Sequence, residues 1–238
     1  IIGYRLGGMT LFDAICYSFG TVATGGFGTH DNSAVGFSAG TQWFMIFLMF
    51  ISGMNFALHY KTIMGGMKGL KETFKDAELR TYFNIVLFLS AALSASLWIM
   101  SGVEGEEGIR AASFQVVSLL TTTGFLTVDY EMWPSFAQGI LFLTFFIGGC
   151  GGSTSGGVKV IRMMILFKSA LMELKKLVHP RAVLHLKIGG SAIKEDVQSR
   201  VVAFFFLYSI LLGIFTLVMT AFGLDLFTAF SSVLATMG

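Results

Sequence analysis

Long apolar stretches alternate along the chain with shorter ones, and several of them end in runs of glycine and threonine. Crossing the roughly 30 Å hydrocarbon core of a bilayer takes about 20 apolar residues in a helix. Three or four segments have this length, and their ranges are 41–60, 82–101, 136–157 and 201–221. The pattern predicts that these segments span a membrane, although the third is apolar only as far as Ile147.

Three shorter apolar runs lie at 11–22, 109–120 and 226–236. At about 1.5 Å per residue, each would form a helix less than about 20 Å long, too short to cross the membrane. Thr10 is suited to cap the first of them, where Asp13 would favour the positive end of the helix dipole. We expect re-entrant helices that end near the membrane centre; interfacial or signal-like segments are the alternative.

A nine-residue string follows the first short run and recurs, in related form, after the second. It reads Ala-Thr-Gly-Gly-Phe-Gly-Thr-His-Asp from Ala23 and Thr-Thr-Thr-Gly-Phe-Leu-Thr-Val-Asp from Thr121. Aligned 98 positions apart, the identical pairs are Thr24 and Thr122, Gly26 and Gly124, Phe27 and Phe125, Thr29 and Thr127, and Asp31 and Asp129. Irregular backbone at membrane depth is tolerated only where it lines a cavity or is buried in protein. Because such a turn also aims carbonyl oxygens at a dehydrated cation, the repeat indicates ion permeation.

The residues that would form the ion filter are two strips of main chain. The first strip is Ala23, Thr24, Gly25 and Gly26, and the second strip is Thr121, Thr122, Thr123 and Gly124. Neutral carbonyl oxygens bind a cation weakly enough to release it. Gly26 and Gly124 permit backbone angles that a β-carbon would penalise. The alternative is a glycine-rich turn that only packs helices together.

The residues beside the strips have less specific roles. Phe27 and Phe125 are expected to anchor the strips by packing rather than to contact ions. Asp31 and Asp129 either bias cations toward the outer mouth or cap local turns.

A second glycine-rich segment interrupts the third long apolar stretch. This glycine loop consists of Gly148, Gly149, Cys150, Gly151, Gly152, Ser153, Thr154, Ser155, Gly156 and Gly157. It does not fit the phosphate-binding pattern G-x-x-x-x-G-K-[ST], because Val158 separates Gly157 from Lys159 and no Ser or Thr follows. Its residues do not favour a stable helix, so we interpret it as a flexible gate below the filter. A simple helix kink is the alternative.

Two basic residues follow the glycine loop. Lys159 and Arg162 could form an electrostatic barrier or receive a signal from a cytosolic partner, and ordinary anchoring at the inner membrane surface is the alternative. The helix expected over 158–178 carries Lys175 and Lys176, which could form a docking surface.

Composition and charge support a membrane protein. The mean hydropathy is +0.75, and 13% of residues are charged, against about 25% in typical soluble domains. Basic residues concentrate in 61–80 and 159–200, which the positive-inside rule places in the cytoplasm. Cys16 and Cys150 are expected to be free thiols. No catalytic triad, carboxylate pair or metal-ligand cluster is apparent, so we expect neither an enzyme nor a cofactor, and no nucleic acid partner.

The repeated unit is a helix, a short re-entrant helix, a Thr/Gly turn and a second helix. We expect an all-α membrane protein whose units surround one pore with pseudo-fourfold symmetry. The divisions are a second unit lacking its first helix (1–60), a cytoplasmic connector (61–81), a third unit (82–178), a further connector (179–200) and the start of a fourth unit (201–238). We therefore expect the chain to be a piece of a longer one.

With these motifs, the sequence resembles the membrane subunit of Trk-type potassium uptake systems, within the Trk/Ktr/HKT superfamily. The resemblance covers essentially all 238 residues and is carried by three segments. These are the glycine loop with its continuation to Arg162, the run Thr24–His30, and the connector with His179-Pro180-Arg181-Ala182-Val183 and Lys187-Ile188-Gly189-Gly190.

The resemblance implies potassium uptake across the bacterial inner membrane by a multi-pass protein with one pore per chain. It implies K⁺ as the metal ion bound by the strips, a homodimer surrounded by membrane lipid, and a cytosolic nucleotide-binding regulatory subunit. Symport of K⁺ with another ion belongs to the same expectation. Two alternatives stay open: a Na⁺-permeable or Na⁺/H⁺-coupled member of the superfamily, and a non-conducting membrane subunit with a signalling or structural role.

Overall fold

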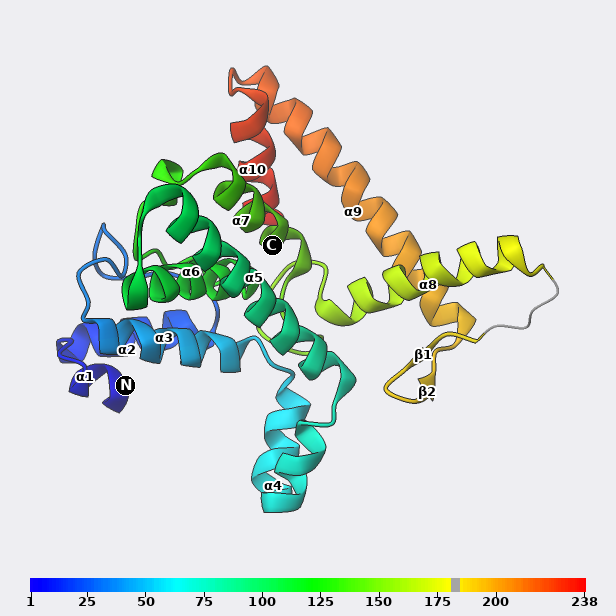
Figure 1. The fold of residues 1–238 in the computed structure, drawn as a ribbon, viewed down its shortest axis with the longest axis horizontal. Helices are drawn as coiled ribbons and strands as arrows, with labels where there is room; N and C mark the ends of the chain where they lie inside the picture. The colour runs from blue at the N-terminus through cyan, green and yellow to red at the C-terminus, as the bar shows by residue number, and fades with distance from the viewer. Residues whose placement is uncertain (181–184) are drawn as a thin grey trace.

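The computed structural model describes residues 1–180 and 185–238, and almost all of its regular structure is helical (Figure 1). The α-helices are α1 (Ile2–Leu6), α2 (Leu11–Val22), α3 (Ala39–Ser52), α4 (Phe56–Thr73), α5 (Ala77–Ser101), α6 (Gly105–Leu120), α7 (Ser135–Ile147), α8 (Val160–Val178), α9 (Glu195–Ala221) and α10 (Leu226–Met237). A 3₁₀ helix, η1 (Tyr130–Met132), precedes α7.

The helices pack in three groups that follow the order of the chain. Helix α2 packs on α3, the helices α5, α6 and α7 pack on one another, and α10 packs back on α9. Contacts between α3 and α6 join the first group to the second, and contacts between α7 and α10 join the second to the third. The C-terminal end of α10 therefore lies in the middle of the molecule, beside the segment that follows α7 (Figure 1).

Among the described residues, two helices are long and apolar enough to cross a membrane alone. They are α5, with 25 residues, and α9, with 27. They contain the predicted spans 82–101 and 201–221. The third predicted span, 136–157, is helical only in α7, which ends at Ile147 as the sequence indicated.

The prediction of one continuous span over 41–60 is wrong. Helix α3 ends at Ser52, α4 begins at Phe56, and the two helices meet at 97°. The turn is stabilised by Asn55, whose Oδ1 accepts a hydrogen bond from the Ala57 amide at 2.8 Å and so starts a new helix in a new direction. Hydropathy averaged over the window does not register a break of three residues.

Helix α4 folds back on itself at Gly66, which has a non-helical backbone with φ of 53°. Its two arms are joined by an ion pair between Lys61 and Glu72 at 2.7 Å and by a hydrogen bond between the hydroxyls of Thr62 and Thr73 at 2.8 Å. The resulting hairpin projects from the helical body (Figure 1). It occupies much of the predicted connector 61–81.

The second connector contains a small sheet that the sequence did not lead us to expect. Strand β1 (Lys187–Ile188) pairs antiparallel with β2 (Ser191–Ala192), and Lys187 lies opposite Ala192. Gly189 and Gly190 form the turn with positive φ angles, so the Lys-Ile-Gly-Gly motif is a tight hairpin. The neighbouring motif residues Arg181, Ala182 and Val183 lie outside the described residues.

The break between α3 and α4 generates a prediction about stability. A β-carbon on Gly53 would lie 2.5 Å from the Tyr82 hydroxyl and 2.8 Å from Cγ2 of Thr121. Gly53→Ala should therefore lower the free energy of unfolding by about 1–3 kcal/mol through overpacking. The control is Gly139→Ala in the exposed middle of α7, where a β-carbon meets nothing within 4 Å and alanine should stabilise the helix by about 0.5–1 kcal/mol. Thermal unfolding of the full-length protein in detergent would compare them, and equal melting temperatures would contradict the packing argument.

Candidate functional site

The three predicted short helices are present. Helix α2 has the predicted bounds, α6 begins earlier than predicted at Gly105, and α10 ends at Met237. Thr10 caps α2 as expected, since its hydroxyl accepts a hydrogen bond from the Asp13 amide at 3.1 Å. Helices α2 and α6 lead directly into the first and second strips.

The two strips have the same backbone hydrogen bonds. The Gly25 amide donates to the Gly20 carbonyl at 2.8 Å, and 98 positions later the Thr123 amide donates to the Ser118 carbonyl at 2.9 Å. The amides before and after them follow the same pattern: Thr24 to Thr21, Gly26 to Gly20, Thr122 to Leu119, and Gly124 to Ser118. The sequence repeat is therefore a repeat in three dimensions.

Both strips hold a threonine in the left-handed backbone region. The φ angle is 52° at Thr24 and 54° at Thr122. A β-branched residue in this region is unusual, and such conformations cost roughly 1–3 kcal/mol and cluster at functional sites. The recurrence of the same strain at matching positions indicates a conformation that both units require.

The strips lie side by side. A β-carbon added to Gly26 would collide with the main-chain oxygen of Thr123, so Gly26 is required for close approach as well as for its φ of 68°. Just beyond the strips, the Ala34 amide donates to the Leu126 carbonyl at 2.8 Å, and the Leu126 amide donates to the Ser33 hydroxyl at 3.0 Å. The structure thus brings the two predicted groups of site residues together.

The amides of each strip are bonded back to the preceding helix, but most of the carbonyl oxygens are not engaged. Among the described residues, no hydrogen bond reaches the main-chain oxygens of Thr24, Gly25 and the three threonines 121–123. The Ala23 carbonyl is the exception, because it accepts from the Thr24 hydroxyl at 2.7 Å. Unengaged carbonyl oxygens are the groups that can replace the water around a cation.

The two phenylalanines after the strips differ. Phe125 is fully buried, its ring 5.2 Å from that of Tyr17 in α2, so the predicted packing role is confirmed for this residue. Phe27 is 85% exposed in this chain, so the packing role expected for it stays a prediction.

Different side chains brace the far ends of the strips. The Thr29 hydroxyl donates to Asp13, whereas the equivalent Thr127 accepts from Gln115 Nε2 at 3.4 Å. Asp129 caps a local turn, accepting from the Glu131 amide at 3.0 Å, which favours the second of its two predicted roles.

The glycine loop is non-helical, as predicted, and it contacts residues at the C-terminal ends of the short helices α2 and α6. The Gly156 amide donates to the Thr122 hydroxyl at 2.7 Å. The Thr154 hydroxyl donates to the carbonyls of Val22, at 3.1 Å, and Ser52, at 3.3 Å. The loop therefore lies against the second strip and against the residue that precedes the first.

The other end of the glycine loop is bonded to the break between α3 and α4. The Cys150 amide donates to the Gly53 carbonyl at 2.9 Å, and the Phe56 amide donates to the Gly152 carbonyl at 3.0 Å. Glu78, in the first turn of α5, accepts from the Gly151 amide at 2.6 Å. Sequence reasoning missed Gly53 and Glu78 as site residues. No local motif distinguishes Glu78, whereas Gly53 ends the run Phe50-Ile51-Ser52-Gly53, which is similar to Phe146-Ile147-Gly148-Gly149.

The side chains of Lys159 and Arg162 contact different parts of the structure. The Lys159 ammonium group donates to the Ser155 carbonyl within the glycine loop. The Arg162 guanidinium lies 4.1 Å from the centre of the Phe204 ring of α9, as in a cation–π contact. Lys159 is therefore part of the loop's own structure, and Arg162 contacts the start of the third helical group.

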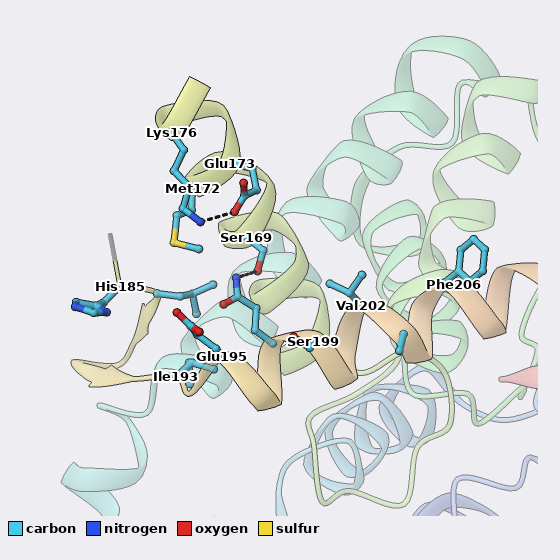
Figure 2. A pocket seen from close by; sticks show the side chains of 13 residues that line it. Ser169, Met172, Glu173, Lys176, His185, Ile193, Glu195, Ser199, Val202 and Phe206 are labelled. Carbon is cyan, nitrogen blue, oxygen red and sulfur yellow. Dashed lines mark hydrogen bonds and ion pairs between the residues drawn. The ribbon is translucent and has the colours of Figure 1, made fainter. Parts of the chain in front are cut away.

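A cavity of about 720 Å³ lies between α8, α9 and the β-hairpin, and no strip or loop residue lines it. Its wall contains the ion pair between Lys176 and Glu173 and a hydrogen bond from Gln198 to Ser169 (Figure 2). Lys176 is engaged with Glu173, so within the described part of the chain only the Lys175 side chain of the predicted docking pair has no hydrogen bond or ion pair.

Comparison with known proteins identifies close relatives. The chain is 41% identical to the Trk system potassium uptake protein TrkH of Salmonella typhimurium, over 97% of this chain and 48% of the relative. It is 38% identical to the Trk system potassium uptake protein TrkG of Escherichia coli, over 99% of this chain and 48% of the relative. The chain thus spans about half the length of these relatives.

The fold also matches a solved structure. The crystal structure of the potassium transporter TrkH from Vibrio parahaemolyticus superposes with a TM-score of 0.94 at 40% identity, covering 99% of this chain and 51% of that one. The sequence profile of the TrkH family, described as a cation transport protein, matches residues 4–238. This chain is therefore an integral membrane protein that belongs to the TrkH family of cation transport proteins.

Proposed function

We propose that this protein takes up potassium ions across the bacterial inner membrane, through a narrow passage lined by main-chain oxygens. The observation that carries the proposal is the pair of strips, which share one backbone conformation, lie side by side and leave most of their carbonyl oxygens unengaged. The relatives named as potassium uptake proteins support K⁺ as the ion.

The proposed ligands are carbonyl oxygens of Ala23–Gly25 and of Thr121–Thr123, with equivalent strips from further units completing the ring. Of these, Ala23 contributes least, because its carbonyl already accepts a hydrogen bond. Dipolar ligands without net charge hold a dehydrated cation while allowing it to leave. The pseudo-fourfold arrangement of the units is part of the proposal.

The glycine loop is the proposed gate. Its hydrogen bonds to Thr122 and Val22 hold it against the second strip and against the residue before the first strip, where it would obstruct an ion leaving the filter. A loop held by individual hydrogen bonds rather than by helical structure can be displaced without unfolding its neighbours. A second copy of the protein and a cytosolic nucleotide-binding subunit are the proposed partners that control this displacement.

The filter assignment predicts a loss of ion selectivity. Gly124→Ser should reduce K⁺/Na⁺ discrimination about tenfold or more, because a side chain at φ of 84° forces the strip out of its conformation. The measurement is ⁸⁶Rb⁺ uptake with Na⁺ competition, using the full-length protein in potassium-transport-deficient cells. The matched control is Gly223→Ser, since Gly223 also has a positive φ, of 95°, and an open β-carbon position but lies outside both strips. Full discrimination in the Gly124 variant would show that the strips do not form the filter.

The gate assignment predicts increased flux when the loop is shortened. Deletion of residues 151–155 removes the Thr154 contacts with Val22 and Ser52 and should raise ion flux and weaken its regulation. Flux of the purified full-length protein in liposomes, with and without its regulatory subunit, measures both effects. Unchanged flux in the deletion variant would contradict the gate.

A further inference from the structure

The carboxylate of Glu78 connects the two sides of the non-helical segment that separates α7 from α8. One of its oxygens, Oε1, accepts hydrogen bonds from the Gly151 amide at 2.6 Å and from the Ile161 amide at 3.1 Å. Gly151 lies in the first half of the glycine loop, and Ile161 lies in the first turn of α8. A single atom on a third helix, α5, therefore holds both sides of the loop.

This contact also completes the start of α8. The first amides of a helix have no partner within the helix, and a side chain at the N-cap position normally accepts from one of them. Thr10 and Asp225 do this for α2 and α10. The N-cap residue of α8 is Lys159, which makes no such bond. Glu78 supplies the missing acceptor from α5, and its negative charge suits the positive end of the helix dipole.

Glu78 lies where the α4 hairpin returns to the helical body. Asp76, two residues earlier, caps α5 by accepting from the Leu79 amide at 2.9 Å. At the other end of the hairpin, the Phe56 amide donates to Gly152, the loop residue next to Gly151. Both ends of the α4 segment are thus bonded to adjacent residues of the glycine loop, so movement of the hairpin would be transmitted to the loop.

We propose that Glu78 is a positioning residue. Its two hydrogen bonds, here called the latch, hold the glycine loop in its closed position and couple the loop to the α4 hairpin. The functional meaning of the latch rests on the proposed function, in which the loop is the gate. Without the carboxylate, two amides lose their acceptor and α8 loses its cap, so the loop leaves the strips more often. The latch itself is a statement about the loop's position and can be measured without ion flux.

Cys150 provides the direct measurement, because it lies in the glycine loop and is fully buried. In the full-length protein, with Cys16 and any cysteine outside this chain changed to serine, the rate of N-ethylmaleimide modification reports how often the loop opens. Glu78→Ala should raise this rate about tenfold, which corresponds to about 1.4 kcal/mol. Glu78→Asp should also raise it, because the shorter side chain cannot reach both amides. Glu78→Gln, which keeps an acceptor oxygen, should raise it less than alanine does.

The matched control is Glu173→Ala, which removes a carboxylate that pairs with Lys176 of α8 and contacts neither the loop nor the α4 hairpin. Its modification rate should equal that of the parent protein. Equal rates in the parent, Glu78→Ala and Glu78→Asp proteins would overturn the latch. Failure of all three Glu78 variants to yield folded, monodisperse protein would also overturn it, since Glu78 would then be required for folding.

Parallel ⁸⁶Rb⁺ uptake separates the latch from the proposed function. Faster Cys150 modification together with faster uptake supports both. Faster modification in a protein that passes no ion in any form would support the latch and refute permeation. Normal uptake with unchanged modification would refute the latch and leave permeation in place.

Discussion

The constraint on which this structure depends is that buried main-chain amides and carbonyls must be paired where water is absent. A helix satisfies this constraint internally, but the two strips, the break at Gly53–Asn55 and the glycine loop are not helical. They pair with one another and with the ends of neighbouring helices. The bonds from Cys150 to Gly53 and from Gly156 to Thr122 are examples. The irregular segments are therefore neighbours because none of them could be accommodated alone.

The same pairing makes the strips suitable for cations. Each strip turns its amides back to its own helix, so that the Gly20 and Ser118 carbonyls accept two amides each. The main-chain amides of each strip are therefore engaged in hydrogen bonds, while most of its main-chain carbonyls are not. The left-handed angles of Thr24 and Thr122 produce this asymmetry, and the strain that they cost is offset by the surrounding hydrogen bonds.

The sequence predicted the parts of the fold that are determined locally. Segment length and hydropathy identified the short helices, with the correct bounds for α2, and the repeat identified both strips. What it could not predict depends on contacts between distant residues. The prediction of a continuous span over 41–60 failed because the chain turns at Gly53, which lies directly against the Tyr82 hydroxyl of another helix, α5. No sequence signal distinguishes Glu78, since its partner Gly151 lies 73 positions away. Phe27 and Phe125 are equivalent in sequence but not in their neighbours.

The breaks in α3–α4 and in α7–α8 show how a repeated unit acquires two roles. They occur at matching places, after Phe50-Ile51-Ser52-Gly53 in one unit and Phe146-Ile147-Gly148-Gly149 in the other. The first break is short and is fixed by the Asn55 cap, so its Gly53 carbonyl and Phe56 amide are presented in a defined geometry. The second break, the glycine loop, is longer. Its Cys150 amide donates to the Gly53 carbonyl, and its Gly152 carbonyl accepts from the Phe56 amide. Because the two strips have the same backbone hydrogen bonds while the breaks differ, the short break of one unit can hold the glycine loop of the other without altering either strip.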